Sequence, residues 1–347
     1  MADHLSEFAQ NLLMTAGVQE VVARDVAEVL LEGDLLGHDT HGLQLLGPYL
    51  GEIEAGSMRK EGEPKVLSEH TCVTCWDGDR LPGPHLVRRA IAWAAPRARA
   101  HGQASVAIRR GHHIACLAAY LEQVARTGLM MIITCSDPSS ASVAPFGGTQ
   151  AVFTPNPLAI GIPTSNDPIM VDISASITTN GMSNRMKAAG LKGEHPWWLD
   201  ALGQPSHDPA VLGTQPPGSI LPLGGLDGGH KGYGLALMIE ALTGGLAGFG
   251  RADISEGWGA TTYVQIIDPA AFAGFGPFAW QTDWIVQACH QNLPRDTDRP
   301  VRLPGERGLA RKAEQLVRGV ALHPAIVPAL KMWAAKLKVE MPKPLIA

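Results

Sequence analysis

Histidine side chains offer the clearest chemistry in this sequence. His38 and His41 lie three residues apart in "GHDTHG", and His112 and His113 are adjacent in "GHH". An imidazole has a pKa of about 6.5, so it can donate or accept a proton at neutral pH, and it can also bind a metal. Neither pair belongs to an HExxH pattern, and no carboxylate stands at ligand spacing beside "GHH", so a metal site has little support.

The pair in "GHDTHG" has three interpretations. If residues 35–42 end a helix, their spacing puts His38 and His41 on one face, as a metal pair or a proton-transfer site requires. The third interpretation is that both histidines only hydrogen-bond to carbonyl groups at the helix end. The residues alone leave these alternatives open.

The glycine-rich stretches contain no dinucleotide-binding fingerprint. None of the 39 glycines falls in GxGxxG after a predicted strand, and GxxxxGK[ST] is absent. In "GGLDGGHKGYG", Lys231 stands at the predicted start of a helix over 231–247, where free N–H groups and an ammonium can hold a phosphate. An ordinary loop followed by a helix is the alternative.

Asp172 and a CxxC pair are two further candidates. Asp172 follows the apolar run "PIMV", and a carboxylate at the end of a buried strand needs a partner. It can orient an imidazole, accept ribose hydroxyls or cap the following turn. Cys72 and Cys75 form the CxxC, but no second Cys or His pair follows to complete four zinc ligands, so we interpret this stretch as a strand.

The composition excludes several classes of protein. The chain has 347 residues, 45% of them hydrophobic, and a net charge of −5 without a block of Lys and Arg, so a nucleic-acid partner has no support. No apolar run approaches the roughly 20 residues of a membrane span. The N-terminus carries acidic residues and is expected to form an amphipathic helix, not a signal peptide. Five cysteines without a framework pattern fit a reducing compartment, so we expect a cytoplasmic protein.

The hydrophobic periodicity predicts two N-terminal helices and then alternating strands and helices. The N-terminal helices are expected over 3–16 and 19–36. The alternation favours an α/β sheet with a substantial parallel component. Strands are predicted at 71–78, 103–110, 129–137, 157–163, 169–174 and 260–272, helices at 84–102, 114–128 and 279–293, and mostly loop at 190–219.

Ten stretches, taken in order, resemble the malate/L-lactate dehydrogenase family of the non-Rossmann type. This family includes malate, sulfolactate, ureidoglycolate and hydroxycarboxylate dehydrogenases, 2,3-diketo-L-gulonate reductase and Δ1-piperideine-2-carboxylate reductase. The matching stretches are "GHDTHGLQL", "DGDRLPG", "GHHIACLAAY", "APFGGTQ", "PNPLAIGIP", "VDISAS", "ALGQPSHDP", "LPLGG", "HKGYGLALMIEALTGGLAGF" and "RLPGERG".

The resemblance implies a fold of the L-sulfolactate dehydrogenase type. This fold is a non-Rossmann dinucleotide-binding mixed sheet flanked by helices, with helical parts at the N- and C-terminal ends, which explains the missing GxGxxG. We expect three parts: a helical substrate and dimerisation part, an α/β part, and an NAD(P)-binding part. Their ranges are 1–70 plus 306–347, 71–135 plus 260–305, and 136–259.

The resemblance also implies a reaction. The family transfers a hydride between the nicotinamide of NAD or NADP and C2 of a small 2-hydroxy acid or 2-oxo acid, and no metal is needed. His41 corresponds to the catalytic acid/base, His113 is a second candidate for that role, and Thr40 stands where the family usually has Ser. An imidazolium beside the substrate can donate the proton that follows hydride addition.

By the same resemblance, further residues bind the substrate and the cofactor. His38, Pro155 and Asn156 are expected at the substrate. Family members are typically homodimers with the active site near the subunit interface, so we expect a homodimer. The expected cofactor-binding residues are Ser136, Asp172, Ile173, Ser174, His230, Lys231, Gly305, Glu306 and Arg307.

Three positions depart from the usual family pattern. Leu45 stands where an Arg commonly faces the substrate carboxylate, Pro155 replaces a Thr, and Met182 replaces a Lys. These departures leave other functions open: a cyclic-imine reductase acting on piperideine- or pyrroline-2-carboxylate, a metal-dependent hydrolase that uses the histidines, or a dinucleotide-binding protein without catalysis.

Overall fold

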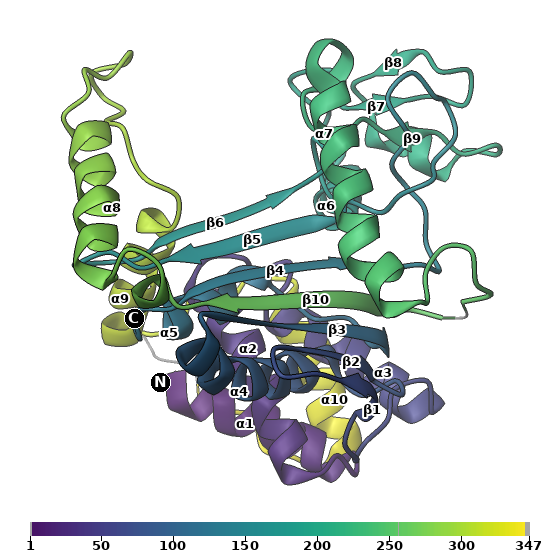
Figure 1. The fold of residues 1–347 in the computed structure, drawn as a ribbon. Coiled ribbons are helices and arrows are strands. Elements are labelled where there is room, and N and C mark those ends of the chain that lie inside the picture. The colour runs from purple at the N-terminus through teal and green to yellow at the C-terminus, as the bar shows by residue number, and fades with distance from the viewer. Residues whose placement is uncertain (1, 256, 344–347) are drawn as a thin grey trace.

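A twisted sheet runs through the middle of the molecule (Figure 1). The computed structural model describes residues 2–255 and 257–343, and within them seven strands form this sheet in the order β1-β2-β3-β10-β4-β5-β6. The strands are β1 Lys65–Glu69, β2 Val73–Asp77, β3 Gln103–Gly111, β4 Met130–Ser136, β5 Pro157–Ile162, β6 Ile169–Ser174 and β10 Ala260–Ile267. The predicted mixed sheet is confirmed, and every strand predicted from an apolar run is present.

The expected substantial parallel component is wrong. Within the described residues, β2 and β3 are the only parallel neighbours in this sheet, joined by helix α4 (Gly83–His101). Strands β3 and β4 point the same way, as the alternation implied, but β10 lies between them and is antiparallel to both. Alternation along the chain fixes the direction of successive strands and not which strands become neighbours.

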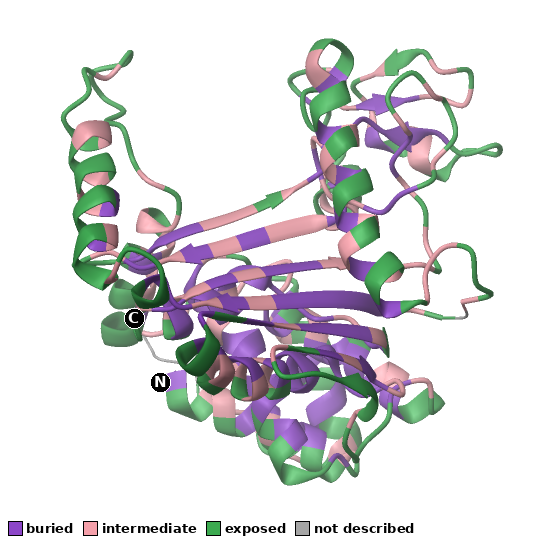
Figure 2. Cartoon of the chain, viewed as in Figure 1, coloured by how far each residue is buried: buried purple, intermediate pink, exposed green. Residues whose placement is uncertain are grey.

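The central and edge strands differ in burial as their sequences require. β10, in the middle of the sheet, is buried along almost its whole length and is rich in Val, Ile, Thr and Tyr. β1, at the edge, is exposed throughout and carries Lys65, Ser68 and Glu69 (Figure 2). Charged edge residues discourage pairing with other chains.

Helices of the N- and C-terminal segments cover one face of the sheet (Figure 1). Phe8 and Leu12 of α1 and Val22, Val26 and Leu30 of α2 are buried at helical spacing and form part of the larger hydrophobic core. Both helices match their predicted ranges to within a residue at each end. The helices concerned are α1 Ala2–Thr15, α2 Glu20–Leu35, α3 Leu46–Ala55, α4, α9 Glu306–Arg318 and α10 Ile326–Leu337.

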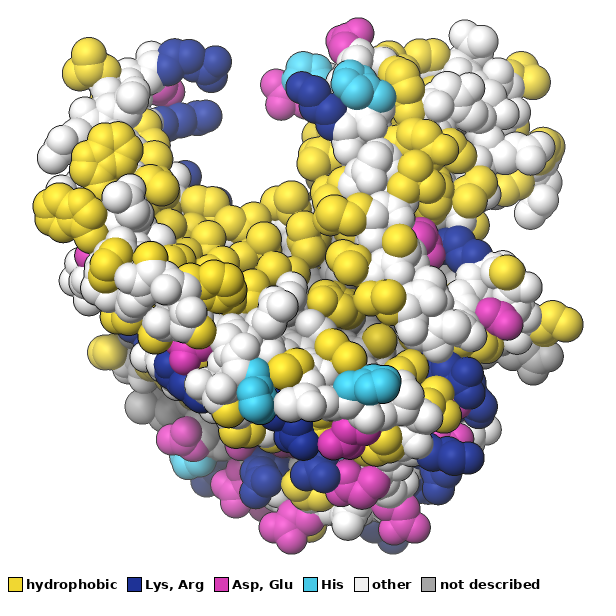
Figure 3. Space-filling view, in the orientation of Figure 1, with side chains coloured by type: hydrophobic (Ala, Val, Ile, Leu, Met, Phe, Trp, Pro, Cys, Tyr) yellow, Lys and Arg dark blue, Asp and Glu magenta, His cyan; other side chains and the backbone are white. Residues whose placement is uncertain are grey.

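The other face of the sheet carries α7 (Gly225–Glu240) at one end and α8 (Phe275–His290) at the other (Figure 1). Between these helices the surface is hollowed and lined by hydrophobic side chains (Figure 3). This apolar face lies above β4, β5 and β6 (Figure 1). No helix among the described residues is long and apolar enough to cross a lipid bilayer.

A small second unit is built from residues between β6 and β10. The segment predicted as mostly loop contains a three-stranded sheet, which packs with α6 (Asn180–Ala188) and α7 around buried Trp198. Its strands are β7 Trp198–Leu199, β8 Pro205–Ser206 and β9 Ser219–Ile220. This unit falls inside the predicted NAD(P)-binding part, and the three-part division of the chain stays a prediction.

The predicted start of α7 is wrong. The helix begins at Gly225, not near Lys231, and ends at Glu240, where a π-helical turn over Ala241–Gly245 follows. Glycines usually weaken a helix, by about 1 kcal/mol each relative to Ala, so the glycine-rich run favours a loop. Here a Cβ on Gly232 would lie 2.4 Å from the backbone nitrogen of Leu223, so close packing requires the glycine.

Two other helix predictions need correction. α2 ends at Leu35, so residues 38–41 form a turn and not a helical face. The helix predicted over 114–128 is confined to a 3₁₀ turn at Leu117–Tyr120 and the short helix α5 at Leu121–Ala125. His113 therefore lies in a loop between β3 and this turn.

Candidate active site

A cavity of about 590 Å³ opens where β4 and β6 end and β10 begins. The turn after α2, the loop after β3 and the first turn of α6 complete its wall. The predicted site residues that line it are His38, Thr40, His41, His113, Ser136, Pro155, Asn156, Asp172, Ile173 and Ser174. Residues from five separate parts of the chain thus meet at one place.

The turn that carries His41 is fixed by a buried carboxylate. Asp34, near the end of α2, is 1% exposed, and its Oδ2 accepts a hydrogen bond of 2.6 Å from the backbone nitrogen of Leu43. A Cβ on Gly42 would lie 2.5 Å from this carboxylate, so only glycine fits there. The "HG" of "GHDTHG" is therefore one structural unit: the glycine permits the turn that presents the histidine.

His41 points into the cavity and has no carboxylate partner among the described residues. Its Nδ1 lies 2.9 Å from Thr40 Oγ1. Burial lowers the pKa of His41 to about 4, and the positive fields of His38 and Arg185 act in the same direction. His41 is therefore neutral at pH 7.

The ring of His113 faces that of His41 across the cavity. The two ring centroids are 5.8 Å apart and the planes are nearly parallel, at 23°. His113 Nδ1 accepts a hydrogen bond of 3.2 Å from the backbone nitrogen of Ala115 and lies 2.9 Å from the Tyr49 hydroxyl. This pattern assigns the proton of the neutral ring to Nε2, and burial holds the pKa of His113 well below its usual value.

His112 has a structural position instead. It is fully buried, its Nδ1 accepts from the backbone nitrogen of His113 at 2.9 Å, and its Nε2 lies 3.2 Å from Glu52 Oε2. It therefore fixes the backbone of the loop that carries His113. The sequence pattern "GHH" did not distinguish these two roles.

Trp258 is a cavity residue that the sequence analysis missed. Its ring lies against His113, with centroids 4.5 Å apart. It also contacts Tyr49, at 5.6 Å between centroids. Nothing in the local sequence "EGWGA" indicates a site residue, because the contact depends on β10 reaching the middle of the sheet.

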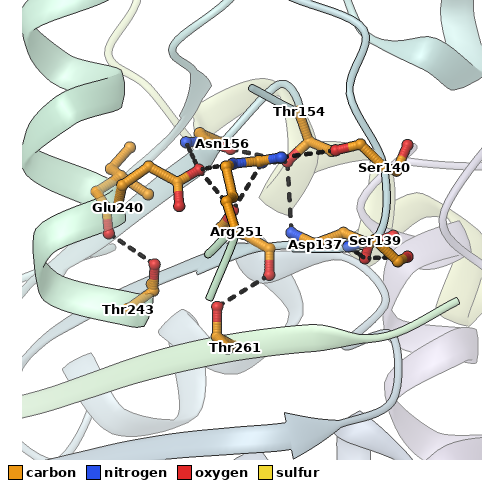
Figure 4. Close-up of polar contacts among 11 residues, drawn as sticks. Asp137, Ser139, Ser140, Thr154, Asn156, Glu240, Thr243, Arg251 and Thr261 are labelled. Atoms are coloured by element: carbon orange, nitrogen blue, oxygen red, sulfur yellow. Dashed lines mark hydrogen bonds and ion pairs between the residues drawn. The ribbon is translucent and has the colours of Figure 1, made fainter. Parts of the chain in front are cut away.

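A polar network behind the cavity was also missed (Figure 4). Arg251 Nε donates to Glu240 Oε1 at 2.6 Å, and its Nη2 donates to Ser136 Oγ at 3.0 Å and Thr154 Oγ1 at 3.2 Å. Glu240 Oε1 also accepts from Ser136 Oγ at 2.8 Å. This ion pair joins the end of α7 to the cavity wall at β4.

Asn156 belongs to the same network (Figure 4). Its Nδ2 donates to Glu240 Oε1 at 2.9 Å and its Oδ1 accepts from Thr154 Oγ1 at 2.8 Å. It is fully buried and has a positive φ of 47°, a conformation that Asn tolerates better than most residues. Its side chain therefore shapes the wall beside Pro155.

Asp172 and its neighbours line the cavity wall at the end of β6. Asp172 Oδ2 accepts a hydrogen bond of 2.9 Å from the backbone nitrogen of Ala118, and burial raises the pKa of Asp172. The side chain of Ile173 is exposed to the cavity, and Ser174 Oγ donates to the backbone carbonyl of Ser176 at 2.8 Å. Polar and apolar groups thus alternate along the end of β6.

Five predicted cofactor residues lie outside the cavity wall. His230 and Lys231 are exposed in the second turn of α7, and Lys231 does not occupy a helix N-terminus as expected. Gly305, Glu306 and Arg307 lie at the start of α9, beside Met170 at the far end of β6, where Glu306 pairs with His290. Gly305, Glu306 and Arg307 therefore lie near the start of β6, whereas the cavity lies at the end of that strand.

No Lys or Arg of the described chain lines the cavity, and Leu45 is part of its wall. Arg185, on α6, contributes a positive field at His41. Its guanidinium donates to Asp39 Oδ1 at 3.1 Å and to Gln44 Oε1 at 3.0 Å, so it braces the His41 turn.

Comparison with known proteins identifies the family. The sequence profile described as malate/L-lactate dehydrogenase matches residues 1–331. An L-lactate dehydrogenase from Cupriavidus necator is 30% identical over 343 residues, covering 97% of each chain. Hydroxycarboxylate dehydrogenase B from Escherichia coli O157:H7 is 30% identical, covering 92% of this chain and 89% of its own. A dehydrogenase structure from Sinorhizobium meliloti superposes with a TM-score of 0.85 at 32% identity, covering 96% of each chain.

The class that the fold and cavity define is that of the dehydrogenases that bind a nicotinamide cofactor without a Rossmann fingerprint. The chain belongs to the malate/L-lactate dehydrogenase family. It is a hydroxy acid dehydrogenase, so the predicted family, fold and enzyme class are confirmed.

The position of Asp34 leads to a prediction about stability and pH. Burial raises the pKa of Asp34 to about 7, from 3.8. The folded state thus holds this proton more tightly than the unfolded state, and Asp34 lowers the free energy of unfolding as pH rises from about 4 to about 7. In Asp34→Asn the amide oxygen can still accept from Leu43, and no charge is buried.

Thermal unfolding of both proteins between pH 5 and pH 8 checks this. We expect the wild type to lose stability relative to Asp34→Asn as the pH rises. Asp298→Asn, at an exposed position in the segment between α8 and α9, is the matched control, and its stability should change with pH as that of the wild type does. A constant difference between wild type and Asp34→Asn across this range would contradict the buried-proton explanation.

Proposed function

We propose that this protein transfers a hydride between NAD or NADP and C2 of a small 2-hydroxy acid or 2-oxo acid, with His41 as the proton acceptor and donor. The observation that carries the proposal is the pairing of two neutral histidines, His41 and His113, in a cavity with the end of β6. When bound, the nicotinamide supplies or accepts the hydride.

The cavity wall fits a nicotinamide. Ile173 offers an exposed apolar surface for a ring, while Ser136 and Asp172 offer polar groups at the ends of β4 and β6. The Glu240–Arg251 ion pair holds Ser136 in place and keeps this wall rigid before any ligand arrives. Such preorganisation is what accurate positioning of a reacting group requires.

His41 is suited to remove the substrate hydroxyl proton. Its Nδ1 is engaged by Thr40, which leaves Nε2 as the nitrogen for the substrate. Since the pKa is about 4, the imidazole is neutral at pH 7 and ready to accept a proton during oxidation. In the reverse direction, reduction of a 2-oxo acid, His41 must donate a proton. The negative charge that develops on the substrate oxygen raises the pKa of His41, so the ring can hold this proton until it is transferred.

His113 has a different role in this proposal. Since Nδ1 accepts from Ala115, the Nε2–H is the group left to face the substrate. A neutral imidazole so fixed is a hydrogen-bond donor and not a base. We therefore assign His113 to stabilise the substrate oxygen, and His41 to move the proton.

The substrate carboxylate is held without an arginine in this proposal. The cavity wall near His41 offers His38, Gln44 and Asn180 as hydrogen-bond donors, and Leu45 provides an apolar surface. A monocarboxylate of the lactate type fits this wall better than a dicarboxylate, because a second carboxylate would have no cation to meet.

Kinetics of His41→Asn and His113→Gln test the division of roles. We expect kcat/KM to fall about 10²–10⁴-fold in His41→Asn, and about 10²–10³-fold in His113→Gln, which keeps a donor but not its position. For reduction by the wild type, kcat/KM should fall tenfold per pH unit between about pH 5 and pH 8, because the imidazolium fraction of His41 falls.

This pH slope should persist in His113→Gln and disappear in His41→Asn. His195→Asn, an exposed histidine outside the cavity, is the control and should match the wild type. If the slope were lost in His113→Gln and kept in His41→Asn, the two roles would be reversed.

A panel of substrates with both cofactors tests the function itself. We expect turnover of small 2-hydroxy acids with NAD or NADP, with lactate-type substrates preferred over malate because the cavity wall lacks a cation. Chelators should not change the rate. Turnover of cyclic imines alone would establish the reductase alternative, and cofactor binding without any turnover would establish a protein that has lost catalysis.

We also propose that the chain forms a homodimer and works in the cytoplasm. α8 exposes Trp280 (69%) and Trp284 (61%) at i, i+4 spacing, and hydrophobic side chains line the hollow between α7 and α8 (Figure 3). A second subunit would cover this apolar face, which lies outside the part expected from the sequence to form the dimer, 1–70 plus 306–347. The five free thiols fit a reducing compartment.

Sedimentation of a Trp280→Glu/Trp284→Glu double variant tests the dimer. We expect a dimer for the wild type at micromolar concentration and a folded monomer for the variant, because two charges would be buried in the interface. Leu202→Glu, at an exposed turn of the small unit, is the control and should remain dimeric. A wild type that sediments as a monomer would exclude the proposal.

A further inference from the structure

Three side chains with metal-binding atoms meet at one side of the cavity. His38 comes from the turn after α2, Cys116 from the loop before the Leu117–Tyr120 turn, and Asp172 from β6. One ligand atom of each, a ring nitrogen, the thiol sulfur and a carboxylate oxygen, lies within 4.8 Å of the other two. His41 and His113 are not part of this cluster.

The three donor atoms select a class of cation. Nitrogen, sulfur and oxygen donors together suit Zn²⁺ and Co²⁺, whereas Mg²⁺ and Ca²⁺ prefer oxygen alone. Around a tetrahedral Zn²⁺ the ligand atoms lie roughly 3.5 Å apart. The ligand atoms lie within 4.8 Å of one another, so they must move closer together to bind the cation, and the exposed side chain of His38 can rotate toward the other two.

The protein already orients two of the three ligands. Asp172 Oδ2 is fixed by the backbone nitrogen of Ala118 at 2.9 Å, and Cys116 Sγ lies 4.0 Å from the same oxygen. Cys116 is 3% exposed and belongs to the cavity wall, so a cation can reach its sulfur from the cavity. Outer hydrogen bonds of this kind hold ligands ready for a metal.

We propose that His38, Cys116 and Asp172 bind one Zn²⁺-class cation, and that the bound cation blocks hydride transfer. Binding forms a bond between the metal and Cys116 Sγ and releases the thiol proton to water. Three protein ligands leave a fourth position that faces the cavity, where water completes the tetrahedron. The blocking effect rests on the proposed function, because it requires Asp172 at the cofactor and His38 at the substrate.

This cation would act as an inhibitor, not as a participant in the reaction. It neutralises Asp172 and occupies the wall at which nicotinamide is proposed to lie. Cys116 therefore makes the enzyme sensitive to free zinc through a residue that the hydride-transfer mechanism does not use.

Titration of the metal-free protein with Co²⁺ tests the binding. A Co²⁺–thiolate bond absorbs in the near ultraviolet, and this absorption does not depend on turnover. We expect a band that saturates at one equivalent in the wild type and in Cys135→Ser, whose thiol lines the same cavity outside the cluster. The band should be lost in Cys116→Ser, and His38→Asn should weaken binding by at least about tenfold.

Inhibition by Zn²⁺, measured relative to the metal-free rate of each variant, tests the blocking effect. We expect inhibition of the wild type and Cys135→Ser, and at least tenfold weaker inhibition of Cys116→Ser. Absence of the band in the wild type, or its persistence in Cys116→Ser, would overturn the site. A band without inhibition would overturn the blocking role, and failure of the proposed function would remove turnover but leave the band.

Discussion

The contact between the Asp34 carboxylate and the backbone at Gly42 and Leu43 determines where the proposed acid/base can lie. The carboxylate lies in the last turn of α2, accepts a hydrogen bond from the backbone nitrogen of Leu43 and leaves no room for a Cβ at residue 42. The chain must therefore turn within residues 37–42, and this turn brings Thr40 and His41 to the cavity. Arg185 braces the same turn from the small second unit. The position of the His41 imidazole thus depends on the buried Asp34 carboxylate, on Gly42 and on α6, which carries Arg185.

The electrostatics of the cavity follow from what surrounds the histidines. His41 has a hydroxyl as its partner where many proton-transfer histidines have a carboxylate, so nothing stabilises its charged form and burial dominates. His113 is held by a backbone N–H and a tyrosine, which favour the neutral ring. Two neutral imidazoles side by side can divide the tasks of accepting a proton and donating a hydrogen bond. Burial raises the pKa of two carboxyl groups of the cavity wall, Asp137 and Asp172, and Asp172 lies on the side of His38.

The sequence predicted the strands and the histidine pairs well because both have local signals. Apolar runs and alternation identified every strand of the large sheet except the exposed edge strand β1, and "GHDTHG" and "GHH" marked two sides of the cavity. Neighbours in space had no local signal. The insertion of β10 between β3 and β4, the Glu240–Arg251 ion pair and the meeting of Cys116 with Asp172 each join distant parts of the chain. α7 was misplaced because glycine has a low helix propensity, and the tight contact that requires Gly232 is a tertiary feature.

The insertion of β10 also constrains how the chain reaches its folded state. β3 and β4 leave facing edges unpaired until Ala260–Ile267 arrives, after the whole of 137–259 has been synthesised. Contacts between residues so far apart are slow to form, and open strand edges are prone to pair with other chains. The cavity wall at β4 and Trp258 becomes complete only with this late strand. A nascent chain therefore acquires its binding site near the end of synthesis, and its need for chaperones should be greatest just before that point.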